Sequence, residues 1–273
     1  AAVGRSVADH RRVVSHPYLN VDTPLGLAHR GGAGEAPENS LRAFRNAVSL
    51  GYRYIETDIR ATADGVPVVF HDETLQRVTD RVGRIRDLTF SEVKKARIGD
   101  AERVHSLQEV LDHFPDIRFN IDIKEDNAVV PVMRLLRRED HLERVCVASF
   151  SRNRLLAVRE VFGESVCTSL APSEIAALVG HSRVGRALSV SGRVLPRGSA
   201  CVQVPPHTTR VRIVTEPFIE AAHARGWPVH VWTIDSPVQM HSLFDLGVDG
   251  IMTDRPSVLR SVLDQRKHGV HAG

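Results

Sequence analysis

Short apolar runs alternate along most of the chain with segments whose apolar residues recur at helical spacing. The apolar runs have the length of buried strands and lie at 25–29, 52–60, 117–124, 144–149, 165–170, 200–204, 228–234 and 249–253. The segments between them predict helices at 39–51, 107–114, 127–140, 151–162, 173–180, 216–225, 236–246 and 256–266. Alternation of strand and helix favours a parallel sheet, and eight such units favour closure into a barrel. The expected fold class is therefore α/β, as a single (β/α)₈ TIM barrel.

The second unit of this barrel is longer than the others. Its strand is followed by the turn signal Asp64-Gly65 and by a second apolar run at 66–70, which together predict a β-hairpin. The segment 73–104 is mostly polar, apart from a short helix introduced by the capping-box pattern Thr89-Phe-Ser-Glu92. We interpret 73–104 as an insertion in one loop and not as a second domain. The expected organisation is an N-terminal arm at 1–24, the barrel at 25–267 and a C-terminal tail at 268–273.

The composition is that of an ordinary globular protein. Of 273 residues, 42% are hydrophobic and 25% are charged, which is ample for a large core. The formal net charge is only +3 and the charges alternate in sign, so no nucleic-acid partner is predicted. The exception is 181–199, which holds four arginines and no acidic residue. This stretch is either an exposed helix and loop or a patch that contacts an anionic lipid surface.

No segment has the character of a membrane span or a secretion signal. A membrane span needs about 20 consecutive apolar residues, and no run approaches that length. The first twenty residues lack the apolar core of a signal peptide, so a cytoplasmic location is expected. The chain begins with Ala1 and not with Met, which leaves an upstream signal or anchor open.

The three cysteines each lie in a short apolar run that predicts a strand. They are Cys146, Cys167 and Cys201. An odd number cannot all pair as disulfides, and such positions are typical of small buried side chains. We therefore expect three buried thiols in a reduced protein, in preference to disulfides or metal thiolates.

Carboxylates lie on the second and third strands of the predicted barrel. Glu56 and Asp58 lie two residues apart, so both side chains point to one face of their strand. Asp122 and Lys124 repeat that spacing on the next strand. Carboxylates aimed into a barrel are destabilising unless they are paired or bound to a metal ion. These oxygen ligands suit Mg²⁺ or Ca²⁺ better than Zn²⁺. The alternative is a salt-bridge network in which Glu56 pairs with Lys124 or Arg30.

Groups suited to proton transfer and phosphate binding fall at the same strand ends, where barrel enzymes place their active sites. His29 and His71 each end an apolar run, and an imidazole titrates near neutral pH. Arg30 offers a planar pair of donors for two phosphate oxygens, and Lys124 adds a point charge. Trp232 is either a core residue or the apolar wall of a glycerol site. Together with a cation, these groups meet the needs of phosphoryl transfer.

Two polar residues precede the first predicted helix. Asn39 is expected to be the N-cap of that helix, because its side chain can accept a hydrogen bond from the first turn. Glu38 is expected to orient Arg30.

An ordered series of short motifs runs through the chain. Residues 27–80 contain HRG, then PENS, then the ETD strand, then the hairpin DG-x-PVV-x-HD, and NIDIK, VWTID and DGIMTDRP follow. This series resembles the glycerophosphodiester phosphodiesterase family, within the phosphatidylinositol-phospholipase-C-like phosphodiesterase superfamily. The resemblance covers roughly residues 25 to 262.

The resemblance implies a metal-dependent enzyme that hydrolyses glycerophosphodiesters, as small-molecule substrates, to sn-glycerol 3-phosphate and an alcohol. By motif it assigns acid–base catalysis to His29 and His71, phosphate binding to Arg30 and Lys124, and a Ca²⁺ or Mg²⁺ ion to Glu56, Asp58 and Asp122. The segment 73–104 would be the family's insertion near the substrate entrance. One position departs from the pattern, because the family usually has Glu where this chain has Asp122. The shorter side chain can alter metal affinity or choice while it preserves oxygen coordination.

The route of hydrolysis and the class of protein leave alternatives. By analogy with related phosphodiesterases, we hypothesise two stages, through a cyclic phosphate that water then opens. A lysophospholipase D or sphingomyelinase-D-like barrel would act on lipids, although its secreted relatives generally rely on disulfides. A non-catalytic barrel that binds phosphodiesters would be expected to lack a His or a carboxylate of the set, and this chain has them all. The sequence predicts no oligomeric state.

Overall fold

The computed structural model describes residues 16–20, 24–99, 101–184, 195–196 and 200–269. Eight parallel strands form its centre: β1 (Leu25–Ala28), β2 (Tyr54–Ala61), β6 (Arg118–Ile123), β7 (Val145–Ala148), β8 (Cys167–Ser169), β9 (Ala200–Val204), β10 (Val229–Val231) and β11 (Gly250–Thr253). β1 pairs with β11 on one side and with β2 on the other, so the sheet closes on itself. The predicted single (β/α)₈ barrel is confirmed.

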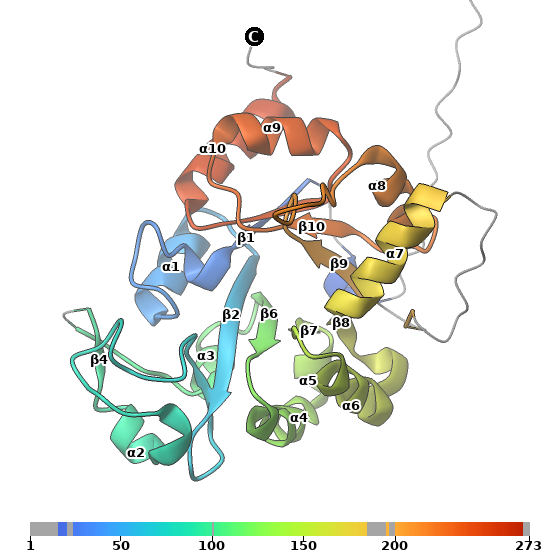
Figure 1. Ribbon diagram of the computed structural model, residues 1–273. Coiled ribbons are helices and arrows are strands. Elements are labelled where there is room, and N and C mark those ends of the chain that lie inside the picture. The colour runs from blue at the N-terminus through green and yellow to red at the C-terminus, as the bar shows by residue number, and fades with distance from the viewer. Residues whose placement is uncertain (1–15, 21–23, 100, 185–194, 197–199, 270–273) are drawn as a thin grey trace, which may run out of the picture.

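Helices surround the barrel on the outside (Figure 1). They are α1 (Leu41–Ser49), α3 (Leu107–His113), α4 (Val129–Leu136), α5 (Glu139–Leu142), α6 (Arg152–Phe162), α7 (Pro172–Val184), α8 (Glu216–His223), α9 (Pro237–Asp245) and α10 (Pro256–Lys267). Their apolar faces pack on the outward side chains of the strands, such as Ile55, Ile59 and Ile121, in one continuous core. Within the part of the chain that the structure describes, no helix has both the length and the apolar character needed to cross a membrane.

Two of the expected helix starts are confirmed, and one is wrong. The capping boxes at Thr89 and Ser106 open α2 (Phe90–Val93) and α3. Helix α1, however, is capped by Ser40, whose hydroxyl accepts a hydrogen bond from a backbone N–H of the first turn. Asn39 has a left-handed backbone, with φ of 55°, and directs its side chain toward Asp58. Because Ser40 satisfies the helix end, the Asn39 amide is available to the barrel interior.

The segment that follows β2 folds against one side of the barrel, on the left in Figure 1. β3 (Pro67–Val69) pairs antiparallel with β2, which confirms the predicted hairpin. Beyond it lie α2 and a small sheet of β4 (Arg97–Ile98) and β5 (Glu102–Arg103). Although 73–104 is mostly polar in sequence, it shares with β3 a small core made of Val68, Phe70, Leu75, Ile85, Val93, Ala96, Ile98 and Val104.

Residues that precede β1 close the amino-terminal end of the barrel. The 3-10 helix Pro17–Leu19 buries Tyr18, whose ring packs edge-on against Tyr54 with 5.2 Å between centroids. His16 caps this short helix by accepting a hydrogen bond from the backbone N–H of Tyr18 at 3.1 Å. Part of the segment that the sequence places in an N-terminal arm therefore belongs to the packed barrel.

Candidate active site

The carboxylates of the second and third barrel strands project into one cavity. Glu56 and Asp58 of β2 face this cavity, while Ile55 and Ile59 pack outward into the core. β6 runs beside β2 with Asp58 opposite Asp122, so the three carboxylates reach the same end of the barrel. Their exposed fractions are only 4%, 1% and 7%, in chain order. Carboxylates this buried need compensation by cations or hydrogen-bond donors.

Lys124 compensates two of these carboxylates. Its Nζ lies 2.8 Å from Oδ1 of Asp58 and 2.6 Å from Oδ2 of Asp122. Burial lowers the pKa of Lys124, but the two carboxylates outweigh burial and raise it to about 12. Burial likewise opposes ionisation of Asp58, yet Lys124 and Arg30 hold its pKa below its usual range. Burial prevails at Asp122 and raises its pKa.

Glu56 is the least compensated member of the set. It accepts a hydrogen bond from the backbone N–H of Arg30 at 2.9 Å, and its Oε2 lies 3.8 Å from Nε2 of His29. Burial and the negative charge of Asp58 raise the pKa of Glu56 to about 7. At neutral pH this side chain is therefore divided between its charged and neutral forms.

His29 is held by a carboxylate that the sequence reasoning did not select. Its Nδ1 lies 2.7 Å from Oδ1 of Asp254, just after β11. Burial lowers the pKa of His29, but Glu56 and Asp254 outweigh it and raise the pKa above 6.5. Asp254 is placed in turn by its backbone N–H, which donates to Asp235 at 2.9 Å. A signal was present, because Asp254 ends the eighth apolar run, at the same rim as the other polar groups.

His71 has an equivalent carboxylate partner, its neighbour in the chain. Its Nδ1 lies 2.6 Å from Oδ1 of Asp72. Burial raises the pKa of Asp72, but hydrogen bonds from Arg77 and His71 lower it to about 2. Arg77 also donates to Glu38 at 2.7 Å, and Glu38 accepts from Arg30 at 3.2 Å, in the orienting role expected of it. Sequence reasoning missed Arg77, because nothing in the polar insertion distinguishes it.

Arg30 is positioned by an unusual backbone. It lies in the 3-10 turn His29–Gly31 with φ of 51°, a left-handed conformation that costs a non-glycine residue about 1–2 kcal/mol. Hydrogen bonds on both sides offset this strain, since its N–H donates to Glu56 and its C=O accepts from the N–H of Asn39, each at 2.9 Å. The turn brings Nε of Arg30 to 3.1 Å from Oδ2 of Asp58.

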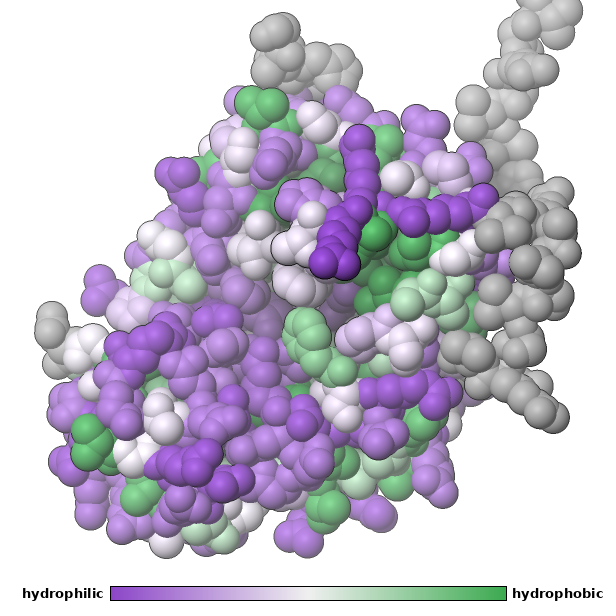
Figure 2. All heavy atoms as spheres, in the orientation of Figure 1, coloured by the Kyte–Doolittle hydropathy of each residue, from purple (hydrophilic) through white to green (hydrophobic). Residues whose placement is uncertain are grey.

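These polar groups occupy one end of a cavity of about 710 Å³. The rest of its wall is largely apolar and includes Leu170, Ile175, Val179, Val204, Val211 and Ile213. Figure 2 shows an apolar hollow on this face, bordered by hydrophilic surface. Trp232 lies on the wall and packs edge-on against Phe150, with 5.8 Å between ring centroids. Phe150 is 63% exposed, and sequence reasoning missed it because one aromatic residue after a strand carries no pattern.

The arginine-rich stretch 181–199 lies largely outside the described residues, which leave out 185–194 and 197–199. Of its arginines, Arg183 is described, at the end of α7 and on the cavity wall. Contact with an anionic lipid surface stays a prediction.

The fold and the site together define a barrel whose cavity gathers carboxylates, imidazoles and cations at one end, as an enzyme that acts on an anionic substrate requires. Residues 29–258 match the model of the glycerophosphoryl diester phosphodiesterase family. The chain belongs to this family. The enzyme class predicted from the sequence, a phosphoric diester hydrolase, is thereby confirmed.

Individual relatives show how far the similarity extends. A probable glycerophosphodiester phosphodiesterase 2 of Mycobacterium tuberculosis is 37% identical over 91% of this chain and 94% of its own length. The human lysophospholipase D GDPD1 is 28% identical over 87% of this chain and 85% of its own length. A crystal structure of a glycerophosphoryl diester phosphodiesterase domain from Mycobacterium tuberculosis covers 88% of this chain and 99% of its own, with a TM-score of 0.76 at 18% identity. That likeness shows the shared fold.

Proposed function

We propose that this protein hydrolyses glycerophosphodiesters to sn-glycerol 3-phosphate and an alcohol. The observation that carries the proposal is a pair of imidazoles, His29 and His71, each anchored through Nδ1 to a carboxylate and each facing one cavity. Arg30 and Lys124 line the same end of that cavity and would bind the phosphate oxygens. The similarity to a glycerophosphodiester phosphodiesterase supports the same substrate class.

Glu56, Asp58 and Asp122 would hold a divalent cation, Ca²⁺ or Mg²⁺. Their chemistry fits, because all three offer the hard oxygen ligands that these ions prefer. In addition, Oδ1 of Asp122 is buried without a hydrogen bond in the described structure. The pKa of Glu56 is raised because nearby cations and donors do not fully offset its burial and the negative charge of Asp58. When bound, the ion would polarise the phosphoryl oxygens and stabilise the negative charge that builds on them.

The two imidazoles would divide the proton transfers. A carboxylate at Nδ1 keeps the proton on that nitrogen, so Nε2 is the atom that can accept or donate. One histidine would take the proton of the glycerol hydroxyl next to the phosphate as that oxygen attacks phosphorus. The other would give a proton to the departing alcohol as its P–O bond breaks, which leaves a cyclic phosphate. In the second stage the roles reverse, and a water molecule opens the ring.

Trp232 would form the apolar wall beside the glycerol carbons. Its ring faces the cavity and is fixed by the edge-on contact with Phe150. Aromatic rings make large apolar contacts with little loss of side-chain freedom. Truncation of Trp232 is therefore expected to raise KM more than it lowers kcat.

The test of this function is release of sn-glycerol 3-phosphate from glycerophosphocholine, glycerophosphoethanolamine and glycerophosphoglycerol. The assay is run in EDTA, then with added Ca²⁺ or Mg²⁺, for the unaltered protein and for His29→Ala and His71→Ala. We expect release that depends on the ion and is lost in both variants. Release that persists in both variants would contradict the assigned acid–base pair. Full-rate hydrolysis of a substrate without the hydroxyl next to the phosphate would exclude the cyclic route.

A second candidate function is hydrolysis of lysophospholipids to a lysophosphatidic acid and the headgroup alcohol. The observation that favours it is the apolar wall, which extends well beyond what a glycerol group can contact and could hold an acyl chain. A human relative bears the name lysophospholipase D.

Val179→Asp separates the two candidate functions. Val179 of α7 lies on the apolar wall, away from the catalytic end. A charge there would oppose an acyl chain and leave a water-soluble substrate unaffected. If lysophospholipids are substrates, kcat/KM for lysophosphatidylcholine should fall at least tenfold, with glycerophosphocholine unchanged. The exposed valine Val238 of α9 provides a matched control as Val238→Asp. Equal kcat/KM values for lysophosphatidylcholine in both variants and the unaltered protein would count against an acyl site.

A further inference from the structure

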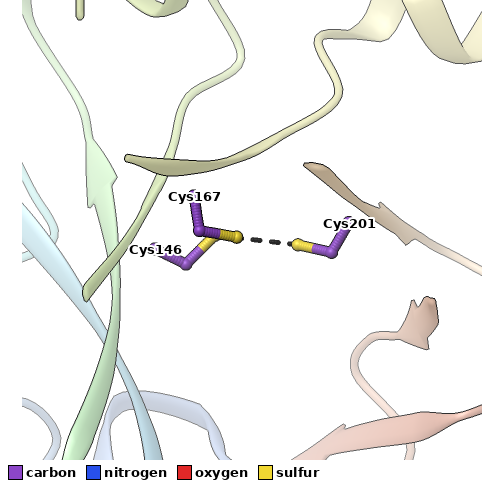
Figure 3. Close-up of side chains that lie close together, drawn as sticks. All are labelled: Cys146, Cys167 and Cys201. Atoms are coloured by element: carbon purple, nitrogen blue, oxygen red, sulfur yellow. Dashed lines mark hydrogen bonds between the residues drawn. The ribbon is translucent and has the colours of Figure 1, made fainter. Parts of the chain in front are cut away.

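Three thiols meet inside the barrel, apart from the catalytic cavity. Cys146 of β7, Cys167 of β8 and Cys201 of β9 lie on consecutive strands, and all are buried and free, as expected from the sequence. Their sulfur atoms lie within 4.8 Å of one another, and Sγ of Cys146 is 3.6 Å from Sγ of Cys201. Figure 3 shows the three side chains converging. This convergence was not expected from the sequence.

His230 lies beside this cluster on the next strand, β10. It is 2% exposed, and its Nδ1 is buried without a hydrogen-bond partner in the described structure. Hydrogen bonds from Cys146 and Cys167, and then the neighbouring His230, hold the pKa of the Cys201 thiol well below its usual value. A buried nitrogen with no partner costs about 1–3 kcal/mol. A histidine with such an atom, beside the Cys201 thiol, indicates that a ligand could complete the group.

We propose that Cys146, Cys167, Cys201 and His230 bind one Zn²⁺ ion in the barrel interior. Zinc takes four ligands in a tetrahedron and favours thiolate sulfur and imidazole nitrogen, the two ligand types present. Zinc–sulfur bonds of about 2.3 Å place tetrahedral sulfur atoms about 3.8 Å apart. The observed sulfur separations reach no further than 4.8 Å, so a shift of about 1 Å or less would suffice for the three sulfur atoms. The ring of His230 lies outside this 4.8 Å group and would have to turn toward it to become the fourth ligand.

This set is distinct from the carboxylates of the active site. None of the three cysteines lines the catalytic cavity, whose wall uses the residues two positions later on the same strands, Ala148, Ser169 and Gln203. Ca²⁺ and Mg²⁺ do not favour sulfur ligands. The zinc ion would therefore be structural. It would join four consecutive barrel strands and would take no part in the proposed hydrolysis.

Binding requires the thiols to lose their protons. Burial raises the pKa of the Cys146 and Cys167 thiols, so both thiols carry a proton when no ion is bound. These protons pass to solvent as the ion binds. Three thiolates, a neutral imidazole and Zn²⁺ carry one net negative charge. An ion that binds the folded chain and not the unfolded chain also raises stability by mass action.

The experiment measures zinc in untagged full-length protein produced in zinc-supplemented medium and dialysed before analysis. We expect one zinc ion per chain by mass spectrometry. Its X-ray absorption spectrum should show sulfur neighbours at about 2.3 Å. Cys201→Ser should lose this zinc. Asp122→Asn, which alters the carboxylate site, should retain it.

Two results for the unaltered protein would overturn the zinc site. One is protein without zinc, and the other is zinc surrounded only by oxygen and nitrogen neighbours, as at the carboxylates. If Cys201→Ser does not fold, the absorption spectrum of the unaltered protein still decides between sulfur ligands and three packed thiols. Retention of sulfur-bound zinc in a folded Cys201→Ser protein would exclude Cys201 as a ligand and sink the four-residue site.

Discussion

Replacement of Asp254 by asparagine tests whether a carboxylate partner tunes His29 for proton transfer. Oδ1 of Asp254 lies 2.7 Å from Nδ1 of His29, where it fixes the ring and stabilises the imidazolium form. Asparagine has nearly the same shape, and its amide oxygen can still accept a hydrogen bond from the Nδ1–H of His29. The substitution therefore removes the negative charge and retains the orientation of the ring. Asp254 is here a positioning residue that acts through His29.

The size of the effect follows from the exposure of the pair. A hydrogen bond to a charged group contributes about 1.5–3 kcal/mol, and one pKa unit corresponds to about 1.4 kcal/mol. The side chains of His29 and Asp254 are 19% and 30% exposed, so solvent screens part of this interaction and the lower end applies. The pKa of His29, now raised above 6.5, should therefore fall in Asp254→Asn.

The assay is the pH dependence of kcat/KM for a glycerophosphodiester, which reports the acid and base of the free enzyme. If His29 is the base, the acidic limb of this profile should move to lower pH, and if His29 is the acid, the basic limb should do so. We expect kcat/KM to fall about tenfold at the optimum. Asp264 of α10, which pairs with Arg260 and does not line the cavity, provides a control as Asp264→Asn. If neither limb of the pH profile moves and kcat/KM stays within about threefold of the unaltered protein, Asp254 does not tune His29.

Three further predictions test the surrounding network. Burial raises the pKa of Glu56 to about 7 from 4.5, so protonation of Glu56 stabilises the folded state. This contribution is complete below pH 4.5 and is lost as the pH rises through 7. Thermal unfolding curves recorded in EDTA should show this loss, and Glu56→Gln should abolish it. Arg30→Lys should lower kcat/KM about 10–100-fold in the same phosphodiester assay, because lysine cannot contact Glu38 and Asp58 at once; activity equal to that of the unaltered protein would exclude a need for the fork. Asn39→Ala should lower the free energy of unfolding in urea by about 1–3 kcal/mol, because the Asn39 amide forms hydrogen bonds with Thr57 and Asp58. Asn39→Gly, which suits φ of 55°, separates the loss of those hydrogen bonds from backbone strain.

The features predicted correctly from the sequence are those that show as a regular repeat of apolar and polar residues along the chain. Alternation along β2 set Glu56 and Asp58 on one face and Ile55 and Ile59 on the other, because successive strand residues point to opposite sides. Eight repeats of strand and helix sufficed for the barrel. Strand lengths were overestimated, since the apolar run 228–234 contains only Val229–Val231 as strand. Apolar side chains also continue into loops that pack on the core, which hides the strand ends.

The features that were missed depend on contacts between distant parts of the chain. Asp254 lies 225 residues after His29, and their pairing exists only because β11 closes the barrel against β1. Arg77 of the insertion donates to Glu38, which precedes α1, and no spacing in the sequence marks that contact. Asn39 was misassigned because it and Ser40 both suit a helix cap, and only the demand of buried Asp58 decides between them.

The charges at the catalytic end match the charge of a phosphodiester when a divalent ion is included. Three carboxylates, Glu56, Asp58 and Asp122, face two cations, Arg30 and Lys124, which leaves one negative charge if every group is ionised. Without an ion, the raised pKa of Glu56 removes this excess by protonation near neutral pH. With a divalent ion Glu56 stays ionised and the balance becomes one positive charge, equal and opposite to that of a phosphodiester. On this account the ion and the proton on Glu56 exclude each other, so ion affinity should rise with pH up to about 7 and then level off. Calorimetric titration with Ca²⁺ or Mg²⁺ at several pH values measures this dependence, and Glu56→Gln should lose it together with much of the affinity.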